Sequence, residues 1–138
     1  MEAAVKVIRQ IQIAMLVTIV LYAVAGEMLS RNLHRPAPTT LFHVFSLISI
    51  SLVGATVVVR RTLIVPSEAA LEQKQDNLAF SRWRTGFIVL YALCEMLGLF
   101  GFVLRLAGFT LANVWGFYLG GIVLLLLYSP RALRSPVR

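Results

Sequence analysis

Long apolar stretches alternate with short polar segments along the chain, and their lengths predict membrane-spanning helices. Four windows of 18 to 20 residues are almost free of charge, at residues 11–29, 40–59, 85–104 and 111–128. A helix rises about 1.5 Å per residue, so each window comes close to the roughly 30 Å thickness of a hydrocarbon core. A backbone in lipid has to satisfy its own hydrogen bonds, which favours helices over strands. The pattern predicts an all-α membrane protein whose single domain, residues 1–138, contains four transmembrane helices.

Prolines and polar residues mark the boundaries between these windows. Pro36 and Pro38 end the first span. The polar segment 60–84 is predicted to be a cytoplasmic loop between the second and third spans. Within it, Pro66 followed by Ser67 could start an extension of the third helix, with Ser67 as its N-cap.

The composition agrees with lipid as the solvent. Hydrophobic residues make up 59% of the chain and charged residues 14%, whereas a soluble domain carries about a quarter charged residues. The only cysteine, Cys94, excludes an internal disulfide and a cysteine-based metal cluster. No combination of His, Asp and Cys predicts a metal or haem site, so we expect no cofactor.

The net charge of +7 is explained by topology and not by nucleic-acid binding, because the basic residues flank the apolar windows. The N-terminus, segment 60–84 and the C-terminal tail carry ten of the 13 Lys and Arg residues. The other side carries three, namely Arg31, Arg35 and Arg105. The excess predicts that both termini and segment 60–84 are cytoplasmic.

Two segments of the chain are similar to each other. Residues 19–28 read IVLYAVAGEM and residues 88–96 read IVLYALCEM, an offset of about half the chain. If this is a duplication, each half is a two-helix hairpin, and the two hairpins are parallel. The alternative is a chance match between apolar segments.

Glu95 is the most informative polar residue, because it lies eleven residues after Arg84 and ten before Arg105, near the predicted bilayer midplane. A carboxyl group there is costly, so we expect it to face the bundle interior and to be protonated or paired. Tyr91, one turn earlier on the same face, could hydrogen-bond it. Glu95 is either a proton or cation site or a neutral acid that holds helices together.

Glu27 is the counterpart of Glu95 in the repeat, but it falls near the outer end of its window. There we expect an interfacial ion pair between Glu27 and Arg31, four residues later, with Glu27 as a further ion-binding candidate, beside Glu95 and Tyr91, as the alternative. His43 begins the second span, where it could relay protons or sense pH, but it is interpreted as a hydrogen-bonded anchor.

Glycines indicate where helices approach each other closely. Residues 116–120 form a GxxxG step, which favours helix association within or between chains. The predicted packing glycines are Gly98, Gly101, Gly116, Gly120 and Gly121. Aromatic residues near the window ends are predicted to anchor at the membrane interfaces, namely Trp83, Trp115, Tyr118 and Tyr128.

The stretch GFIVLYALCEMLGLFGFVLRLAG, residues 86–108, resembles the carboxylate-bearing helix of the proteolipid subunits of rotary ATPases. That resemblance implies that Glu95 binds a transported proton or sodium ion. The chain departs from that family because both acids lie on the first helix of their halves and no GxGxG run precedes them. As a whole, the chain is more similar to small bacterial four-helix integral membrane proteins, which also have a Pro-Arg pair closing the last span, here Pro130-Arg131.

Two functions follow as expectations. The first is a non-enzymatic subunit in a bacterial-type inner membrane, whose partners are the lipid bilayer and either further copies of itself or other membrane subunits. The second is a proton- or cation-coupled channel or transporter, or a proteolipid-like ion-binding subunit, that uses Glu95. No nucleophile–base pair or metal set points to an enzyme.

Overall fold

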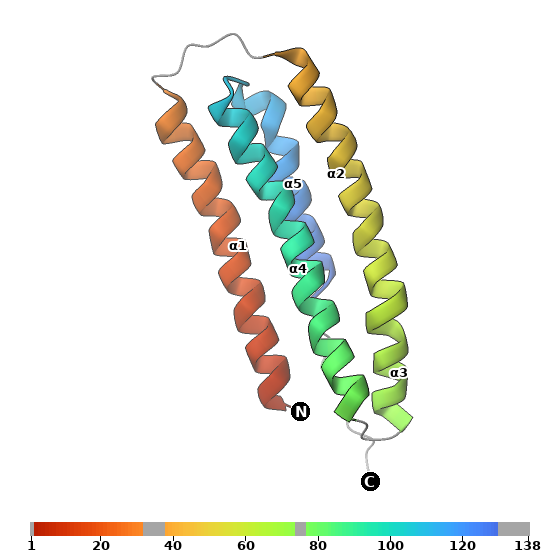
Figure 1. The fold of residues 1–138 in the computed structure, drawn as a ribbon. Coiled ribbons are helices and arrows are strands. Elements are labelled where there is room, and N and C mark those ends of the chain that lie inside the picture. Colours follow the sequence, from red (N-terminus) through yellow and green to blue (C-terminus); the bar gives the residue numbers. More distant parts are fainter. Residues whose placement is uncertain (1, 32–37, 74–76, 130–138) are drawn as a thin grey trace.

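The computed structural model describes residues 2–31, 38–73 and 77–129 of the chain (Figure 1). The described residues contain helices and no strands, which confirms the all-α prediction. The elements in chain order are α1 (Glu2–Ser30), α2 (Thr39–Val59), the π-helical turn η1 (Arg60–Ile64), α3 (Val65–Gln73), α4 (Asn77–Leu106) and α5 (Leu111–Leu127).

Three stretches of helix are long and apolar enough to cross a membrane, as the sequence predicted. They cover Val5–Ser30, Thr39–Leu71 and Asn77–Leu106. The fourth predicted span corresponds to α5, an apolar helix of 17 residues. At about 1.5 Å per residue α5 is roughly 25 Å long, somewhat shorter than a hydrocarbon core.

Helix α4 is the centre of the bundle and packs against α1, α2 and α5 (Figure 1). Helices α1 and α2 lie on opposite sides of α4 and have no extended contact with each other in the described residues. Helices α4 and α5 do pack together as an antiparallel hairpin. In the described residues, only the second half of the chain therefore forms a packed helical hairpin. The internal duplication stays a prediction.

The core follows the length of α4, whose buried side chains contact all three neighbouring helices. Leu90, Cys94 and Leu104 are fully buried. Trp83 and Tyr118, predicted to be interfacial anchors, are buried as well. Helix α3 packs against α4 and covers Trp83, whose indole N–H donates to Glu68 Oε1 over 3.4 Å.

Segment 60–84 was predicted to be a loop that could contain an extension of the third helix, and its described residues are helical. Helix α2 continues through η1 into α3, and α4 begins at Asn77, so most of this segment is helical. The described arginines of this segment are exposed, so they do not have to interrupt the helix. Ser67 is not an N-cap, since its hydroxyl donates to the Leu63 carbonyl one turn earlier, at 2.6 Å.

Pro66 lies inside this continuous helix and not at its start. Proline has no N–H group, and its ring clashes with the carbonyl four residues before it. The wider π-helical turn η1 directly precedes Pro66, and the backbone N–H of Val65 donates to Arg60 O, five residues earlier. A π-helical turn makes room for such a ring, so the helix continues past the proline.

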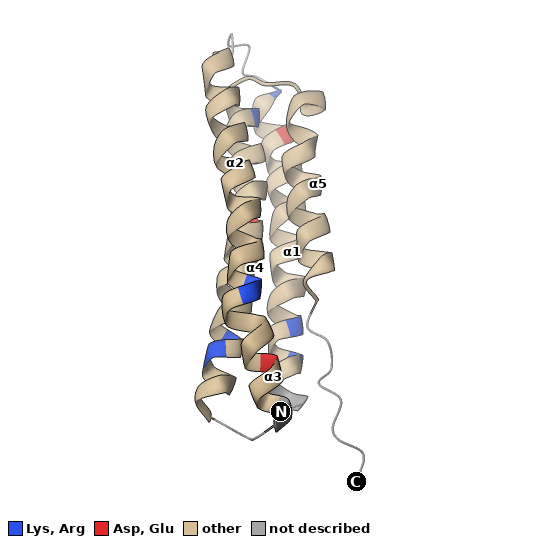
Figure 2. Ribbon diagram, turned by 90° about the vertical axis from the view of Figure 1, so that its right-hand side faces the viewer, with Lys and Arg blue, Asp and Glu red and all other residues tan. Residues whose placement is uncertain are grey.

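Charged side chains concentrate at the two ends of the bundle. Figure 2 shows most Lys and Arg positions at the end where the N-terminus and α3 lie, and fewer at the opposite end. The long middle of the bundle is almost free of charge. This distribution fits helices whose central parts lie in lipid.

Candidate functional site

Helices α1, α4 and α5 pack closely at one junction. Ile19 of α1 is fully buried against Gly98 of α4, where an added Cβ would lie 2.9 Å from Ile19 Cγ1. On α5, a Cβ at Gly121 would lie 2.9 Å from the carbonyl oxygen of Cys94 and 3.1 Å from Ile19 Cδ1. Gly98 and Gly121 thus lie at close contacts between helices of one chain.

Gly101 also packs inside the chain, against an aromatic ring. A Cβ at Gly101 would lie 3.0 Å from two atoms of the Tyr118 ring. The missing side chain makes room for this ring between α4 and α5, and so explains why Tyr118 is buried and not an interfacial anchor.

Glu95 lies beside the same junction, on the side of α4 that faces α1. Its side chain is half-buried, and Tyr22 Oη donates to Glu95 Oε1 over 3.5 Å, a long hydrogen bond. Tyr22 is in turn held by a ring contact with Phe102, with centroids 5.7 Å apart. No cation pairs with Glu95 among the described residues. The candidate ion site is therefore a carboxyl group with one neutral donor from a neighbouring helix.

The hydroxyl of Tyr91 does not hydrogen-bond Glu95, as the sequence analysis had suggested it could. Its hydroxyl donates to the backbone carbonyl of Tyr128 over 3.3 Å, and its ring is fully buried against Phe87. Residues four positions apart share a helix face only approximately. The ring of Tyr91 is enclosed in the core, and its hydroxyl reaches the end of α5, so it contributes to the α4–α5 hairpin.

Glu27 forms an ion pair, but with a different arginine from the one predicted. Arg105 Nη2 and Nε both donate to Glu27 Oε2, at 2.9 Å and 3.1 Å, and Arg105 Nη1 donates to the carbonyl of Phe109 at 2.8 Å. The Arg105 side chain is 16% exposed and that of Glu27 37%, whereas Arg31 is exposed. The pair links parallel helices α1 and α4 about ten residues, or roughly 15 Å, beyond Glu95.

The hydroxyl of Tyr118 lies near this ion pair without a partner. It is buried and makes no hydrogen bond with the described residues. A Cβ at Gly26 would lie 3.2 Å from this oxygen and 3.4 Å from Arg105 Cγ. The ring of Tyr118 therefore packs against Gly101 and its hydroxyl oxygen against Gly26, but this oxygen makes no hydrogen bond with the described residues.

A polar contact that the sequence analysis missed lies at the other end of the junction. Gln12 is buried, and its amide Nε2 donates to the Leu125 carbonyl at 2.6 Å, while Ser129 Oγ donates to Gln12 Oε1 at 3.3 Å. The sequence pattern could have identified Gln12 as a core residue, because it shares a helical face with the apolar residues Ile8 and Ile19. A glutamine on the core face of a spanning helix needs hydrogen-bond partners from another helix.

The GxxxG step of α5 faces away from the rest of the chain. A Cβ added at Gly116 or at Gly120 would meet nothing within 4 Å. Its neighbours Trp115 and Leu119 are 56% and 43% exposed, so this face is apolar and open. His43 is exposed, and its Nδ1 lies 2.9 Å from the carbonyl oxygen of Thr39. This contact agrees with the interpretation of His43 as a hydrogen-bonded anchor.

Comparisons of the chain with protein-family models, with curated proteins and with solved structures found no match. Within the described part of the chain, no group of three or more His, Cys, Asp or Glu side chains is placed to hold a metal ion.

Proposed function

We propose that this chain is a non-enzymatic, multi-pass protein of a bacterial-type inner membrane. It crosses the bilayer four times, with both termini and the segment between α3 and α4 in the cytoplasm. The excess of Lys and Arg at the end of the bundle that carries α3 supports this orientation (Figure 2). Helix α5 packs along α4 in the antiparallel direction, which supports a fourth crossing.

Single cysteines at the two ends of the bundle test this orientation. Asn77 begins α4 and Thr110 precedes α5, and both are exposed. In a Cys94→Ala background, Thr110→Cys in intact cells should react with a membrane-impermeant maleimide and Asn77→Cys should react only after lysis. The reverse pattern would contradict the orientation, and equal labelling of both would contradict a single topology.

The proposed role is that of a subunit, which associates with further copies of itself or with other membrane proteins through α5. The observation that carries this proposal is the open GxxxG step at Gly116 and Gly120. Elsewhere in the chain, Gly98, Gly101 and Gly121 each receive a group from another helix. Because small residues let helices approach closely, an unfilled pair on one face supports packing against a second chain.

Native mass spectrometry of the protein released from membranes would test this role. Gly120→Leu should remove the partner, because the added side chain keeps the facing helix away. Gly54→Leu is the matched control, since Gly54 of α2 is equally open. A monomeric wild-type protein, or an assembly that survives Gly120→Leu, would contradict association through this face.

A second candidate function is proton- or cation-coupled transport through Glu95. The observation that favours it is the half-buried position of Glu95, which has a single long hydrogen bond from Tyr22 and no cation among the described residues. A purely structural acid is expected to have more complete hydrogen bonding.

Proton flux into liposomes distinguishes a transporting Glu95 from a structural one. Glu95→Gln keeps the shape and removes the titratable proton, and Glu27→Gln is a control for loss of a carboxyl group elsewhere. Transport predicts flux in the wild type that Glu95→Gln abolishes and Glu27→Gln retains. Equal flux in the wild type and Glu95→Gln, or no flux above empty liposomes, would exclude transport through Glu95.

A further inference from the structure

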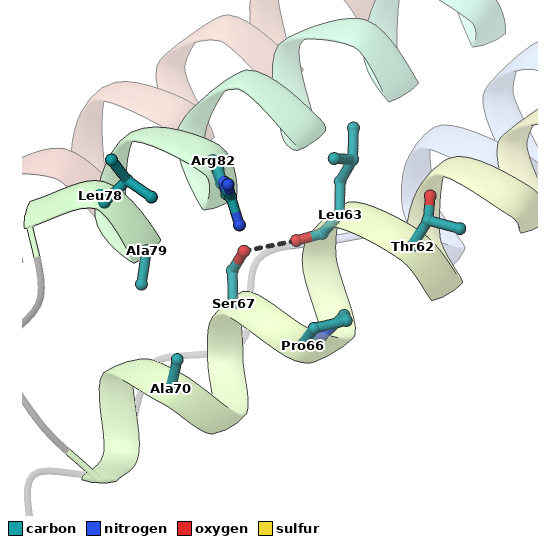
Figure 3. Close-up of a pocket in the computed structure, with 8 residues that line it drawn as sticks. All are labelled: Thr62, Leu63, Pro66, Ser67, Ala70, Leu78, Ala79 and Arg82. Atoms are coloured by element: carbon teal, nitrogen blue, oxygen red, sulfur yellow. Dashed lines mark hydrogen bonds between the residues drawn. The ribbon is translucent and has the colours of Figure 1, made fainter.

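A groove lies between η1–α3 and the first turns of α4, at the end of the bundle that is rich in basic residues (Figures 2 and 3). Its volume is about 190 Å³, enough for about six water molecules at roughly 30 Å³ each. Eight residues line it, namely Thr62, Leu63, Pro66, Ser67, Ala70, Leu78, Ala79 and Arg82.

The groove follows from the local sequence. Small side chains face each other across it, Ala70 from α3 and Ala79 from α4. On the α2 side, the π-helical turn and Pro66 change the helix geometry beside it. These features keep α3 and α4 from closing completely over this part of their interface.

One cation faces this space. Figure 3 shows the guanidinium group of Arg82 extending from α4 toward α3, near Ser67. Arg82 forms no ion pair with any residue that the structure describes. Glu68, the acid next to Ser67, instead accepts the indole N–H of Trp83. The groove thus offers a guanidinium group whose charge no described carboxylate neutralises.

The hydroxyl groups in the groove complement this cation. Thr62 donates to the Val58 carbonyl at 2.8 Å, and Ser67 donates to the Leu63 carbonyl at 2.6 Å. Their protons are therefore engaged within the helix, and their oxygen atoms are available as acceptors. A suitable ligand carries an anion for Arg82 together with hydroxyl donors. The remaining lining, Leu63, Pro66, Leu78 and the two alanines, is apolar.

We propose that this groove binds the headgroup of an anionic phospholipid with a polyol headgroup, of the phosphatidylglycerol type. The phosphate lies against Arg82, the headgroup hydroxyls donate to Thr62 and Ser67, and the glycerol backbone contacts the apolar walls. The inference rests on the proposed membrane insertion, which places this end of the bundle at a bilayer surface. Basic pockets between helices at that level are suited to acidic headgroups. A free phosphate ion would leave the apolar walls without a partner.

Retention of lipid during native mass spectrometry tests the site. The protein would be equilibrated with equal amounts of phosphatidylglycerol, phosphatidylethanolamine and phosphatidylcholine. Wild type should retain phosphatidylglycerol preferentially, and Arg82→Gln should lower that retention roughly fivefold, the effect of losing one direct hydrogen-bonded contact with the phosphate. Arg84→Gln removes an exposed charge two residues later and should leave retention unchanged.

A second pair of variants tests the groove independently of charge. Ala70→Leu fills the groove and should displace the lipid, whereas Ala69→Leu, on an exposed neighbouring position, should not. Equal losses in Arg82→Gln and Arg84→Gln, or retention by Ala70→Leu, would overturn the proposal. An Arg82-dependent rise in melting temperature with inorganic phosphate alone, equal to that with lipid, would overturn the lipid assignment. These outcomes are separate from the maleimide labelling, which tests membrane insertion and orientation.

Discussion

Glu27 and Arg105 join the C-terminal turns of the parallel helices α1 and α4. Two nitrogens of the Arg105 guanidinium group donate to one carboxylate oxygen of Glu27, at 2.9 Å and 3.1 Å. The third contact of the guanidinium group, to the Phe109 carbonyl, holds the turn between α4 and α5 in the same cluster. One side chain therefore connects α1, α4 and the turn that leads to α5.

Removal of this arginine should destabilise the bundle. Arg105→Gln leaves Glu27 half-buried without its cation, and we expect a loss of about 1–3 kcal/mol, between the values for exposed and buried pairs. Thermal unfolding in detergent measures this loss. Arg31→Gln is the control, because the sequence favoured Arg31 as the partner and the structure leaves it exposed. A larger effect of Arg31→Gln would restore the sequence-based pairing.

Adjacent glycines of α5 should differ in their tolerance of alanine. Gly121→Ala places a methyl group 2.9 Å from the backbone oxygen of Cys94, which cannot move away as a flexible side chain could, so we expect a loss of about 1–3 kcal/mol. Gly120→Ala meets open space and should leave the stability of the isolated chain unchanged or slightly higher. Melting temperatures of the two purified variants check the contrast, which equal values would contradict.

Two buried tyrosines should respond oppositely to loss of their hydroxyl groups. Tyr91→Phe removes the donor to the Tyr128 carbonyl and should cost about 1 kcal/mol. Tyr118→Phe removes a buried hydroxyl that has no partner in the described residues, so stability should stay equal or rise. Chemical or thermal unfolding of both variants measures the difference. A marked loss in Tyr118→Phe would indicate that its hydroxyl has a partner in the native protein.

The hydrogen bond to Glu95 should depend on Tyr22 and not on Tyr91. Infrared difference spectra against Glu95→Gln isolate the vibration of this carboxyl group. Tyr22→Phe should shift that band, because it removes the donor at 3.5 Å, and Tyr91→Phe should leave it in place. The opposite result would support the contact that was predicted from sequence spacing.

The repeat-like segments show how far sequence similarity determines environment. Tyr22 and Tyr91 occupy the same position in the two similar stretches, yet Tyr22 contacts Glu95 and Tyr91 contacts the end of α5. The glutamates at the matching position of the two stretches also have different partners. Glu27 is paired with Arg105, and Glu95 accepts a hydrogen bond from a neutral donor. The local sequence is similar, but α4 is surrounded by three helices and α1 lies at the edge of the bundle.

The sequence alone determined the helices and most of their ends, since their apolar length and the need to satisfy the backbone in lipid depend on residues that are near each other in the chain. It also singled out Glu95, Glu27 and the glycines as residues that need a special environment. The tertiary structure decided the partners, because a helix-spacing argument finds only neighbours on the same helix. The partners of Glu27, Tyr91 and Gln12 lie 78, 37 and 113 residues away. The continuous helix through Pro66 also depended on tertiary structure, since α3 is held in place by its packing against α4.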